Sequence, residues 1–165
     1  MNIWNRHWIV AHKDKLGDSL LEVGSQIVTG QEAIALRIEV QPLVKEYIGL
    51  DMGAANGVDI VADAKHMPFP DNRFDSIVSL DCFEHIDWPR DVARECARVL
   101  KPGGYFFLAT VFSFPIHGYP CDYWRYTPNC LKLLIEDAGL EVIELTQAAE
   151  LTTPGVVQVI GRKPV

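Results

Sequence analysis

Short apolar segments alternate with helix-like segments along most of the chain, and this alternation predicts the fold. Several apolar segments are nearly continuous, which is typical of strands that are covered on both faces of a parallel sheet. The predicted strands are Ser19–Val23, Glu46–Leu50, Asp59–Ala62, Asp75–Leu80, Tyr105–Val111, Glu141–Leu145 and Val156–Ile160. We therefore expect an α/β architecture: a doubly wound sheet with helices on both faces, formed by a single domain over residues 1–165.

Two helices are marked by their start and stop residues. Asp87 is expected to cap the first, with Pro89 in its first turn and the Lys-Pro-Gly-Gly run at 101–104 as its stop. Thr127 predicts the start of the second helix, which Gly139 ends. Both segments carry apolar residues at helical spacing: Val92, Ala93, Cys96, Val99 and Leu100 in the first, and Leu131, Leu134 and Ile135 in the second.

Two further helical segments have weaker signals. Residues 1–18 form a possible amphipathic segment, in which the face with Trp4 and Trp8 is expected to join the core rather than to act as a lid. A brief helix is expected over Gln31–Arg37, after the first strand.

Composition and charge narrow the class of protein. The net charge of −7 argues against a surface for duplex nucleic acid, because phosphate contacts require clustered Lys and Arg. The longest apolar run, YFFLATVFSF, is too short to span a bilayer, and the N-terminus lacks the apolar core of a signal peptide. The four cysteines show no CxxC pair and no zinc-type spacing with histidine. We expect a cytoplasmic protein with free thiols, no metal, no nucleic acid and no membrane partner; the sequence indicates no oligomeric state.

Acidic residues follow four of the predicted strands. Glu22 and Gly24 end the first strand, and Asp51, Asp63 and Asp81 end the next three. Ligands of doubly wound sheets bind outside the carboxyl ends of the strands, so these acids are candidates for a binding site. Each acid taken alone is equally well explained as a helix cap or a surface turn.

The acids separate two classes of cofactor. A dinucleotide needs a G-x-G-x-x-G turn for its pyrophosphate, whereas the stretch LLEVGSQIVTG offers only Gly24 and Gly30 beside a carboxylate. S-adenosylmethionine carries ribose hydroxyls, an adenine amine and a positive charge, but no phosphate. Asp51 could accept from the ribose and Asp63 from the adenine amine, and methionines at 52 and 67 could pack on the purine.

The run GVDIVADAKHMPFPDNRFDSIVSLDCFEHIDWPRDVARECARVLKPGGYFFLAT carries a family resemblance. Its features VADA, MPFPDNRFD, EHI and RVLKPGG, in this order, resemble the central part of class I S-adenosylmethionine-dependent methyltransferases of the methyltransferase domain 11, small-molecule type. The resemblance covers Leu20 to Leu145. It implies a seven-stranded, mostly parallel Rossmann-like sheet with an antiparallel last strand, S-adenosylmethionine as cofactor, and a small-molecule acceptor of the methyl group.

The resemblance also implies which residues contact the methionine part of the cofactor. Glu22, Gly24 and Ser25 would face it, and the backbone of Leu80 and Asp81 would lie against its amino end. Most members of the family have a run close to E-x-G-x-G-x-G after the first strand, where this chain has EVGSQIVTG. A smaller branch has serine in place of the second glycine, so the stretch resembles a variant cofactor loop.

The remaining implied contacts are to the adenosine part. Asp51 would hold the ribose, with Met52 beside the adenine. Asp63 would accept from the adenine amine, and the backbone of Ala64 would contact an adenine ring nitrogen.

The catalytic candidate is His85, just after the fourth strand. Its near-neutral intrinsic pKa suits a general base, although a structural histidine is an equally good interpretation. The neighbouring Glu84 is interpreted as a helix-start acid rather than a catalyst.

The loop at 113–126 is the candidate acceptor-binding segment. Tyr119, Tyr123, Trp124 and Tyr126 could line a pocket, and Arg125 could bind an anionic group of the acceptor. In the alternative interpretation, the aromatic residues pack the loop onto the domain and Arg125 pairs with Asp122.

Two other functions fit parts of the sequence. The altered glycine loop and the short chain would suit a non-catalytic subunit that binds S-adenosylmethionine within a larger assembly. A nicotinamide-dependent oxidoreductase on a similar sheet is a remote alternative, because the acidic strand ends oppose phosphate.

Overall fold

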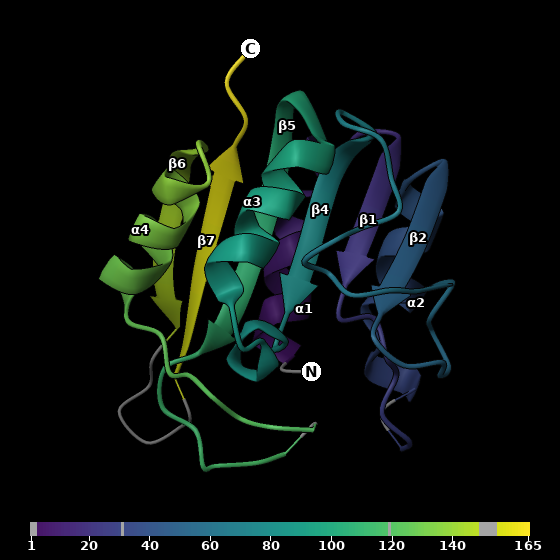
Figure 1. Ribbon diagram of the computed structural model, residues 1–165. Coiled ribbons are helices and arrows are strands. Elements are labelled where there is room, and N and C mark those ends of the chain that lie inside the picture. Colours follow the sequence, from purple (N-terminus) through teal and green to yellow (C-terminus); the bar gives the residue numbers. More distant parts are fainter. Residues whose placement is uncertain (1–2, 31, 119, 149–154) are drawn as a thin grey trace.

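Seven strands form one sheet in the computed structural model, which describes residues 3–30, 32–118, 120–148 and 155–165 (Figure 1). The strand order is β3-β2-β1-β4-β5-β7-β6. The strands are β1 Ser19–Val23, β2 Glu46–Asp51, β3 Ile60–Val61, β4 Phe74–Leu80, β5 Leu100–Val111, β6 Glu141–Ala148 and β7 Val156–Arg162. All seven predicted strands are present, but β5 begins at Leu100 instead of Tyr105 and β6 continues to Ala148 instead of Leu145.

The direction of the strands also agrees with the predicted architecture. Strands β1 to β5 pair in parallel, whereas β7 lies between β5 and β6 and is antiparallel to both. The order reverses at β1, which lies between β2 and β4. This reversal places the carboxyl ends of β1, β2 and β4 side by side, at the bottom of Figure 1.

Helices cover both faces of the sheet, as predicted (Figure 1). Helices α1 (Ile3–Ala11) and α2 (Leu36–Val40) lie on one face, and α3 (Pro89–Val99) and α4 (Pro128–Asp137) lie on the other. Each face therefore has its own apolar core, which explains why all five residues of β1 are buried. Burial on both faces is the physical reason for the nearly continuous apolar segments in the sequence.

The start of α3 corrects one prediction. Trp88, not Asp87, occupies the N-cap position, and no side chain caps this helix. The Asp87 carboxylate instead accepts hydrogen bonds from the Trp88 N–H at 2.9 Å and from Lys65 Nζ at 3.0 Å. Pro89 begins the helix with its fixed φ and without an N–H that would need a cap, so the carboxylate is free for Lys65.

The ends of the helices show how the backbone changes direction. Helix α3 ends at Val99, and β5 begins at Leu100, so the strand already contains the Lys-Pro-Gly-Gly run that was expected only to stop the helix. The predicted bounds of α4 are confirmed: Thr127 Oγ1 accepts from the Cys130 N–H at 3.2 Å, and Gly139 follows the helix with a φ of +80°.

The two weaker helix predictions are confirmed in part. Helix α1 forms as expected, and Trp8 is buried against Phe107 with ring centroids 5.8 Å apart; the side chain of Trp4 lies outside the described part of the structure. The expected brief helix at 31–37 is replaced by a 3₁₀ turn at Glu32–Ile34 and by α2, which begins at Leu36. Ala35 between them is extended, with ψ at 137°, and this interrupts the helix.

The described residues also form four short 3₁₀ helices: η1 Lys13–Lys15, η2 Glu32–Ile34, η3 Gln41–Leu43 and η4 Phe83–His85. Among the described residues, no helix has the length and apolar character needed to cross a membrane.

Candidate functional site

A small cavity lies where the carboxyl ends of β1 and β4 meet. Its volume is about 100 Å³. Five residues that the sequence placed at a cofactor line it: Glu22, Gly24, Ser25, Leu80 and Asp81. The remaining lining residues come from the segment after β1 and from α2: Gln26, Ile27, Val28, Ala35, Leu36 and Arg37. The structure thus brings together the residues predicted to face the methionine part of a cofactor.

Gly24 makes the turn out of β1 possible. Its φ is +83°, and a Cβ atom at this position would lie 2.4 Å from Cys82 Sγ and 2.6 Å from Cys82 Cβ. The N–H groups of Gly24 and Ser25 both donate to the Leu50 carbonyl, at 2.9 and 3.2 Å. Positive φ and the lack of space both require glycine, so this glycine is explained without a phosphate.

Glu22 is a buried acid on the floor of the cavity. One carboxylate oxygen accepts a 2.6 Å hydrogen bond from the Tyr47 hydroxyl. Burial raises the pKa of Glu22 to about 7, and the Tyr47 hydrogen bond and the nearby Arg37 only partly oppose this shift. A cation bound in the cavity would favour the ionised form of Glu22.

Ser25 supplies a polar atom without a partner. Its side chain is 3% exposed, and its Oγ makes no hydrogen bond to any described residue. A buried hydroxyl of this kind costs free energy unless a ligand satisfies it. The glutamate, the free hydroxyl and the turn at Gly24 suit the charged amino-acid end of S-adenosylmethionine.

The four residues predicted to contact adenosine lie outside the cavity, along the ends of β2 and β3. Asp51 contacts the edge of the cavity: Asp51 Oδ2 accepts a hydrogen bond from the N–H of Gln26, a lining residue, at 3.1 Å. Met52 follows with 73% of its surface exposed. Asp63 accepts from the Lys65 N–H at 2.9 Å, and Ala64 follows it in the chain.

Met67 does not join these residues. It is 4% exposed and packs in the core beneath α3. The suggested contact of Met67 with a purine is therefore wrong, because the segment after β3 turns inward before this residue.

Asp81 is positioned by a contact that the sequence did not reveal. The backbone of Asp81 has a φ of +50°, which is uncommon for a residue with a side chain, and its Oδ1 accepts from Asn5 Nδ2 at 2.8 Å. Asn5 is fully buried, and its Oδ1 accepts from Gln158 Nε2 at 2.9 Å. Helix α1 and β7 thus hold Asp81 in place. No clear signal in the sequence marks this contact, because Asn5 is followed by the polar residues Arg6 and His7.

Three side chains form a second group below the ends of β4 and β5, which we name the histidine cluster: Glu84, His85 and His117. Each offers a ligand atom, and these atoms lie within 4.8 Å of one another. The ring centroids of the two histidines are 4.8 Å apart, with the rings nearly perpendicular. His117 was not a candidate in the sequence, because it is distant from His85 along the chain.

Glu84 lies in the first turn of η4, as a helix-start acid would, but its side chain is buried. It is fully buried in η4, and its Oε2 accepts from Thr110 Oγ1 at 2.6 Å. Its Oε1 makes no hydrogen bond to any residue that the structure describes. Burial raises the pKa of this carboxyl group, although the Thr110 hydrogen bond lowers it.

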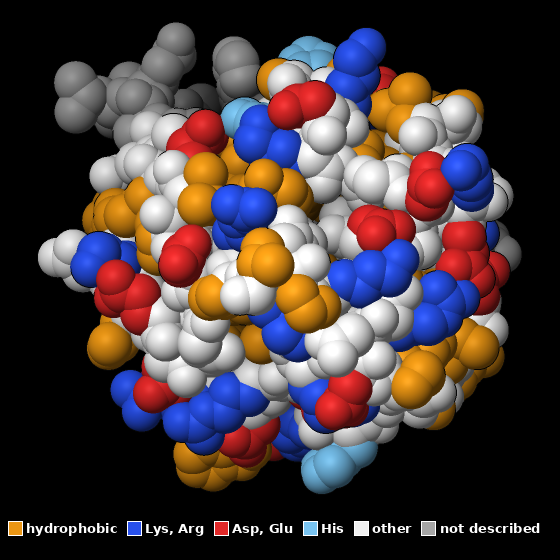
Figure 2. All heavy atoms as spheres, turned by 90° about the horizontal axis from the view of Figure 1, so that it is seen from above, with side chains coloured by type: hydrophobic (Ala, Val, Ile, Leu, Met, Phe, Trp, Pro, Cys, Tyr) orange, Lys and Arg blue, Asp and Glu red, His pale blue; other side chains and the backbone are white. Residues whose placement is uncertain are grey.

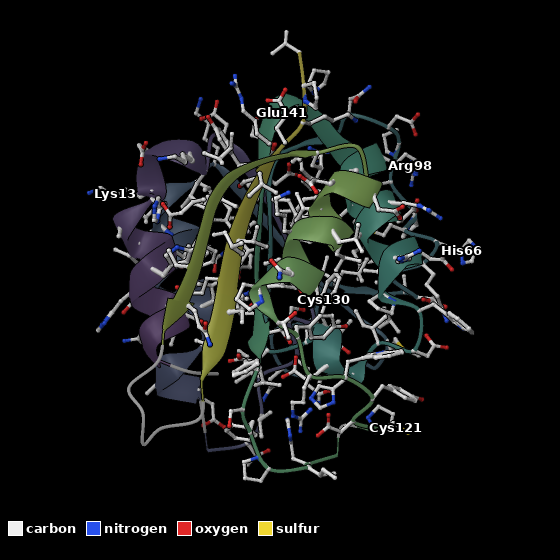
Figure 3. The ribbon with its side chains drawn as sticks, turned by 90° about the vertical axis from the view of Figure 1, so that its left-hand side faces the viewer. Lys13, His66, Arg98, Cys121, Cys130 and Glu141 are labelled. Carbon is white, nitrogen blue, oxygen red and sulfur yellow. The ribbon has the colours of Figure 1, made fainter. Side chains whose placement is uncertain are left out.

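His85 is oriented by the loop. Its Nδ1 lies 2.6 Å from the carbonyl oxygen of Cys121, which fixes Nδ1 as the protonated nitrogen that donates to this oxygen. Nε2 is then the ring nitrogen with a lone pair. Figure 3 labels Cys121 on the loop below the sheet.

Asp122 and Arg125 hold the loop together and place His117. The guanidinium group uses all five of its N–H donors within the protein, on the carbonyl oxygens of residues 114, 115 and 124 and on both oxygens of Asp122. Asp122 Oδ2 also accepts from the His117 N–H at 2.9 Å and lies 3.1 Å from His117 Nδ1. The guanidinium group holds the pKa of Asp122 far below its usual range. This geometry matches the alternative interpretation, in which the two residues pair.

The aromatic residues of the loop divide into two groups. Tyr123 and Trp124 are 51% and 44% exposed, although Trp124 Nε1 donates to the Ile86 carbonyl at 2.8 Å. Tyr126 is 2% exposed and donates to the Phe83 carbonyl at 2.9 Å, so it belongs to the core and not to a pocket wall. Tyr119 lies outside the described residues.

A wider depression of about 440 Å³ lies at the opposite ends of the strands. Its charged residues pair with one another, for example Lys101 with Asp75 at 2.8 Å and Arg73 with Glu46 at 2.6 Å. Figure 2 shows this end of the molecule, where acidic and basic side chains are interspersed. Charges that are already paired offer little to a ligand. The cavity at the end of β1 is therefore the better candidate for a cofactor site, although it is smaller.

Comparison with known proteins identifies relatives of this chain. Residues 26–108 match the family described as methyltransferase domain. A ubiquinone/menaquinone biosynthesis C-methyltransferase of Pseudomonas fluorescens is 30% identical over 154 residues, which cover 82% of this chain and 60% of the relative. The methyltransferase GfsG of Streptomyces halstedii is 33% identical over 109 residues, which cover 57% of this chain and 38% of the relative. The chain thus spans less than two thirds of the length of these relatives.

The fold has solved counterparts. The 1,6-didemethyltoxoflavin-N1-methyltransferase of Burkholderia thailandensis, solved with 1,6-didemethyltoxoflavin and S-adenosylhomocysteine, superposes with a TM-score of 0.74. The superposition covers 98% of this chain and 77% of that protein at 15% identity, so it supports the fold alone. The family match spans half of the chain, from the cavity through β4 and most of β5. The chain therefore belongs to the class I S-adenosylmethionine-dependent methyltransferases.

Proposed function

We propose that this chain transfers a methyl group from S-adenosylmethionine to a small-molecule acceptor. The observation that carries the proposal is the cavity at the end of β1, which is lined by Glu22, by the turn at Gly24 and by Ser25, whose buried hydroxyl has no partner among the described residues. These groups suit an amino acid with a positive charge and oppose a pyrophosphate.

The residues around the cavity would bind and orient the cofactor. Ser25 Oγ and the exposed backbone of the turn would contact its carboxylate, and Glu22 its ammonium group. Asp51 would accept from the ribose hydroxyls, with Met52 and Asp63 along the adenine. When bound, S-adenosylmethionine supplies a methyl group on a positively charged sulfur, which is transferred by in-line displacement.

The acceptor would enter from the side of the histidine cluster. We propose His85 as the catalytic residue, since its Nε2 carries the lone pair while Nδ1 donates to the Cys121 carbonyl at 2.6 Å. Exposed Tyr123 and Trp124 would line the entrance. Asp122 and Arg125 would act on the acceptor indirectly, by holding the loop.

The test measures binding and turnover separately. Calorimetric titration with S-adenosylhomocysteine should give a one-to-one complex, and Ser25→Val should weaken it at least tenfold, since a buried polar contact is lost. Ser113→Val, in the loop, is the matched control and should leave this affinity unchanged. Absence of binding by the wild-type protein would contradict the proposal.

The alternative of a non-catalytic subunit shares the cofactor site and differs in turnover. Release of S-adenosylhomocysteine in the presence of a panel of small hydroxyl, thiol and amine acceptors would support the enzyme. Tight binding without release across the panel would favour the subunit. Protection against heat by NAD(H), and not by S-adenosylmethionine, would instead favour the oxidoreductase.

The cellular location is a further proposal. The four cysteines are all free, and Cys96 is buried, as expected for a chain that works in a reducing compartment such as the cytoplasm.

A further inference from the structure

We infer that the histidine cluster is a binding site for a divalent transition-metal ion of the zinc type, held by one carboxylate oxygen of Glu84 and one ring nitrogen each of His85 and His117. The three ligand atoms lie within 4.8 Å of one another, although the residues come from η4 and from the distant loop at 113–126. Two histidines and one glutamate form a known ligand set of catalytic zinc sites.

The ring geometry fits a shared ion. Zinc binds imidazole nitrogen at about 2.0–2.1 Å, so two imidazoles on one tetrahedral ion have centroids roughly 5 Å apart. The centroids of His85 and His117 are 4.8 Å apart, with an interplanar angle of 83°. Small side-chain rotations would bring the ligand atoms to the separation of roughly 3.3 Å that a tetrahedral ion requires.

Both histidines are already oriented as metal ligands usually are. A ligating histidine normally donates its second ring N–H to a carbonyl or carboxylate oxygen. His85 Nδ1 lies 2.6 Å from the Cys121 carbonyl oxygen. His117 Nδ1 lies 3.1 Å from the Pro115 carbonyl oxygen and 3.1 Å from Asp122 Oδ2. Nε2 of each ring is therefore the atom left for an ion. Arg125 fixes Asp122 from the other side, with Nη2 2.7 Å from Oδ2.

The Glu84 side chain supports the metal site independently of the geometry of the two histidines. It is fully buried, and its Oε1 makes no hydrogen bond to any described residue, while its Oε2 is satisfied by Thr110. A buried carboxylate oxygen without a partner is costly, and a cation beside it removes this cost. His85 and His117 are half-buried, so the ion would keep a side open to the acceptor.

If the chain transfers a methyl group as proposed, the acceptor could bind the ion at this open position. A hydroxyl or thiol group that binds the ion loses its proton to water more readily. His85 Nε2 would then serve as a ligand in place of a general base. The inference departs from the expectation that the chain binds no metal, which rested on cysteine spacing.

The experiment uses the full chain, freed of metal with a chelator, dialysed and titrated with zinc chloride. We expect one equivalent of zinc with a Kd of micromolar or below, measured by calorimetry and by metal analysis after dialysis. Replacing zinc with cobalt(II) should give the visible absorption bands of a tetrahedral site. These readouts do not depend on turnover, and S-adenosylhomocysteine binding by the metal-free protein tests the proposed function separately.

Variants assign the ligands. His117→Gln, on the surface loop, should weaken zinc binding at least tenfold, whereas His66→Gln, an exposed histidine near α3, should not change it (Figure 3). Glu84→Gln should also weaken it, with circular dichroism used to confirm the fold. Cys121→Ser should bind zinc like the wild type. The inference would be overturned if the wild-type protein bound no zinc, if His117→Gln bound zinc as tightly as the wild type, or if Cys121→Ser no longer bound zinc.

Discussion

At the end of β1, the cavity is formed mainly by neighbours in the sequence, whereas the histidine cluster is assembled from segments that are far apart. Glu22, Gly24 and Ser25 lie on one turn, and β4 adds Leu80 and Asp81. Glu84 and His117 meet only because the loop at 113–126 folds back on η4, where the N–H groups of Tyr123 and Trp124 both approach the Glu84 carbonyl.

The two regions also differ in how their positions are fixed. The cavity depends on close packing of backbone, since a side chain at position 24 would collide with Cys82. The histidine cluster depends on hydrogen bonds and charge, through Arg125, Asp122 and the Cys121 carbonyl. Substitutions that remove space should therefore affect the cavity most, and substitutions that remove donors should affect the loop.

The largest effect is expected at Gly24. Gly24→Ala should lower the free energy of unfolding by about 3 kcal/mol, because it adds left-handed strain to a collision with Cys82. Gly30→Ala is the matched control: its φ is +86°, but a Cβ there meets nothing within 4 Å, so only the strain of about 1 kcal/mol should appear. Urea unfolding measures both. Equal losses in the two variants would show that packing at Gly24 does not matter.

The second effect concerns the pH dependence of stability through Glu22. Its pKa rises from 4.5 in the unfolded chain to about 7 in the folded protein, so the folded state holds the proton more tightly. The contribution of Glu22 to the free energy of unfolding is therefore complete below pH 4.5. It declines as the pH rises to about 7, by up to about 3 kcal/mol in all.

Glu22→Gln should remove that decline. The free energies of unfolding of wild type and variant, measured between pH 4.5 and 7.5, should diverge along the pH axis. Glu141→Gln, at an exposed position, should instead give a curve parallel to that of the wild type. A Glu22→Gln curve that also runs parallel would mean that burial does not shift this acid.

The cavity could be predicted from the sequence better than the histidine cluster, because its residues are neighbours in the chain. Strand ends, Gly24 and the acids after each strand are local signals, and the cavity could be predicted from them. The contact between Asn5 and Asp81 and the meeting of His85 with His117 depend on tertiary structure. Tyr126 and Met67 were misplaced because an aromatic or sulfur side chain beside a binding segment looks the same in sequence whether it faces a ligand or the core.

A smaller effect is expected for the loop. Arg125→Lys replaces a planar group with five donors by a single ammonium group, at a cost of about 1–2 kcal/mol. Hydrogen exchange of amides at 113–126 should become roughly tenfold faster, while the affinity for S-adenosylhomocysteine changes less than twofold. Arg94→Lys, which disturbs an exposed pair with Asp137, should leave loop exchange unchanged. A parallel loss of cofactor affinity would mean that the two regions are not independent.

The smallest effect on stability is expected at Met52, which separates binding from folding. Its side chain is 73% exposed, so Met52→Ala should change the free energy of unfolding by less than about 0.5 kcal/mol. The affinity for S-adenosylhomocysteine should nevertheless fall about three- to tenfold, because contact with adenine would bury this side chain. Leu133→Ala, 54% exposed on α4, is the control and should change neither quantity. If both variants bind equally well, adenine does not lie against Met52. The adenosine part would then have to follow a different path from the cavity, away from the end of β2.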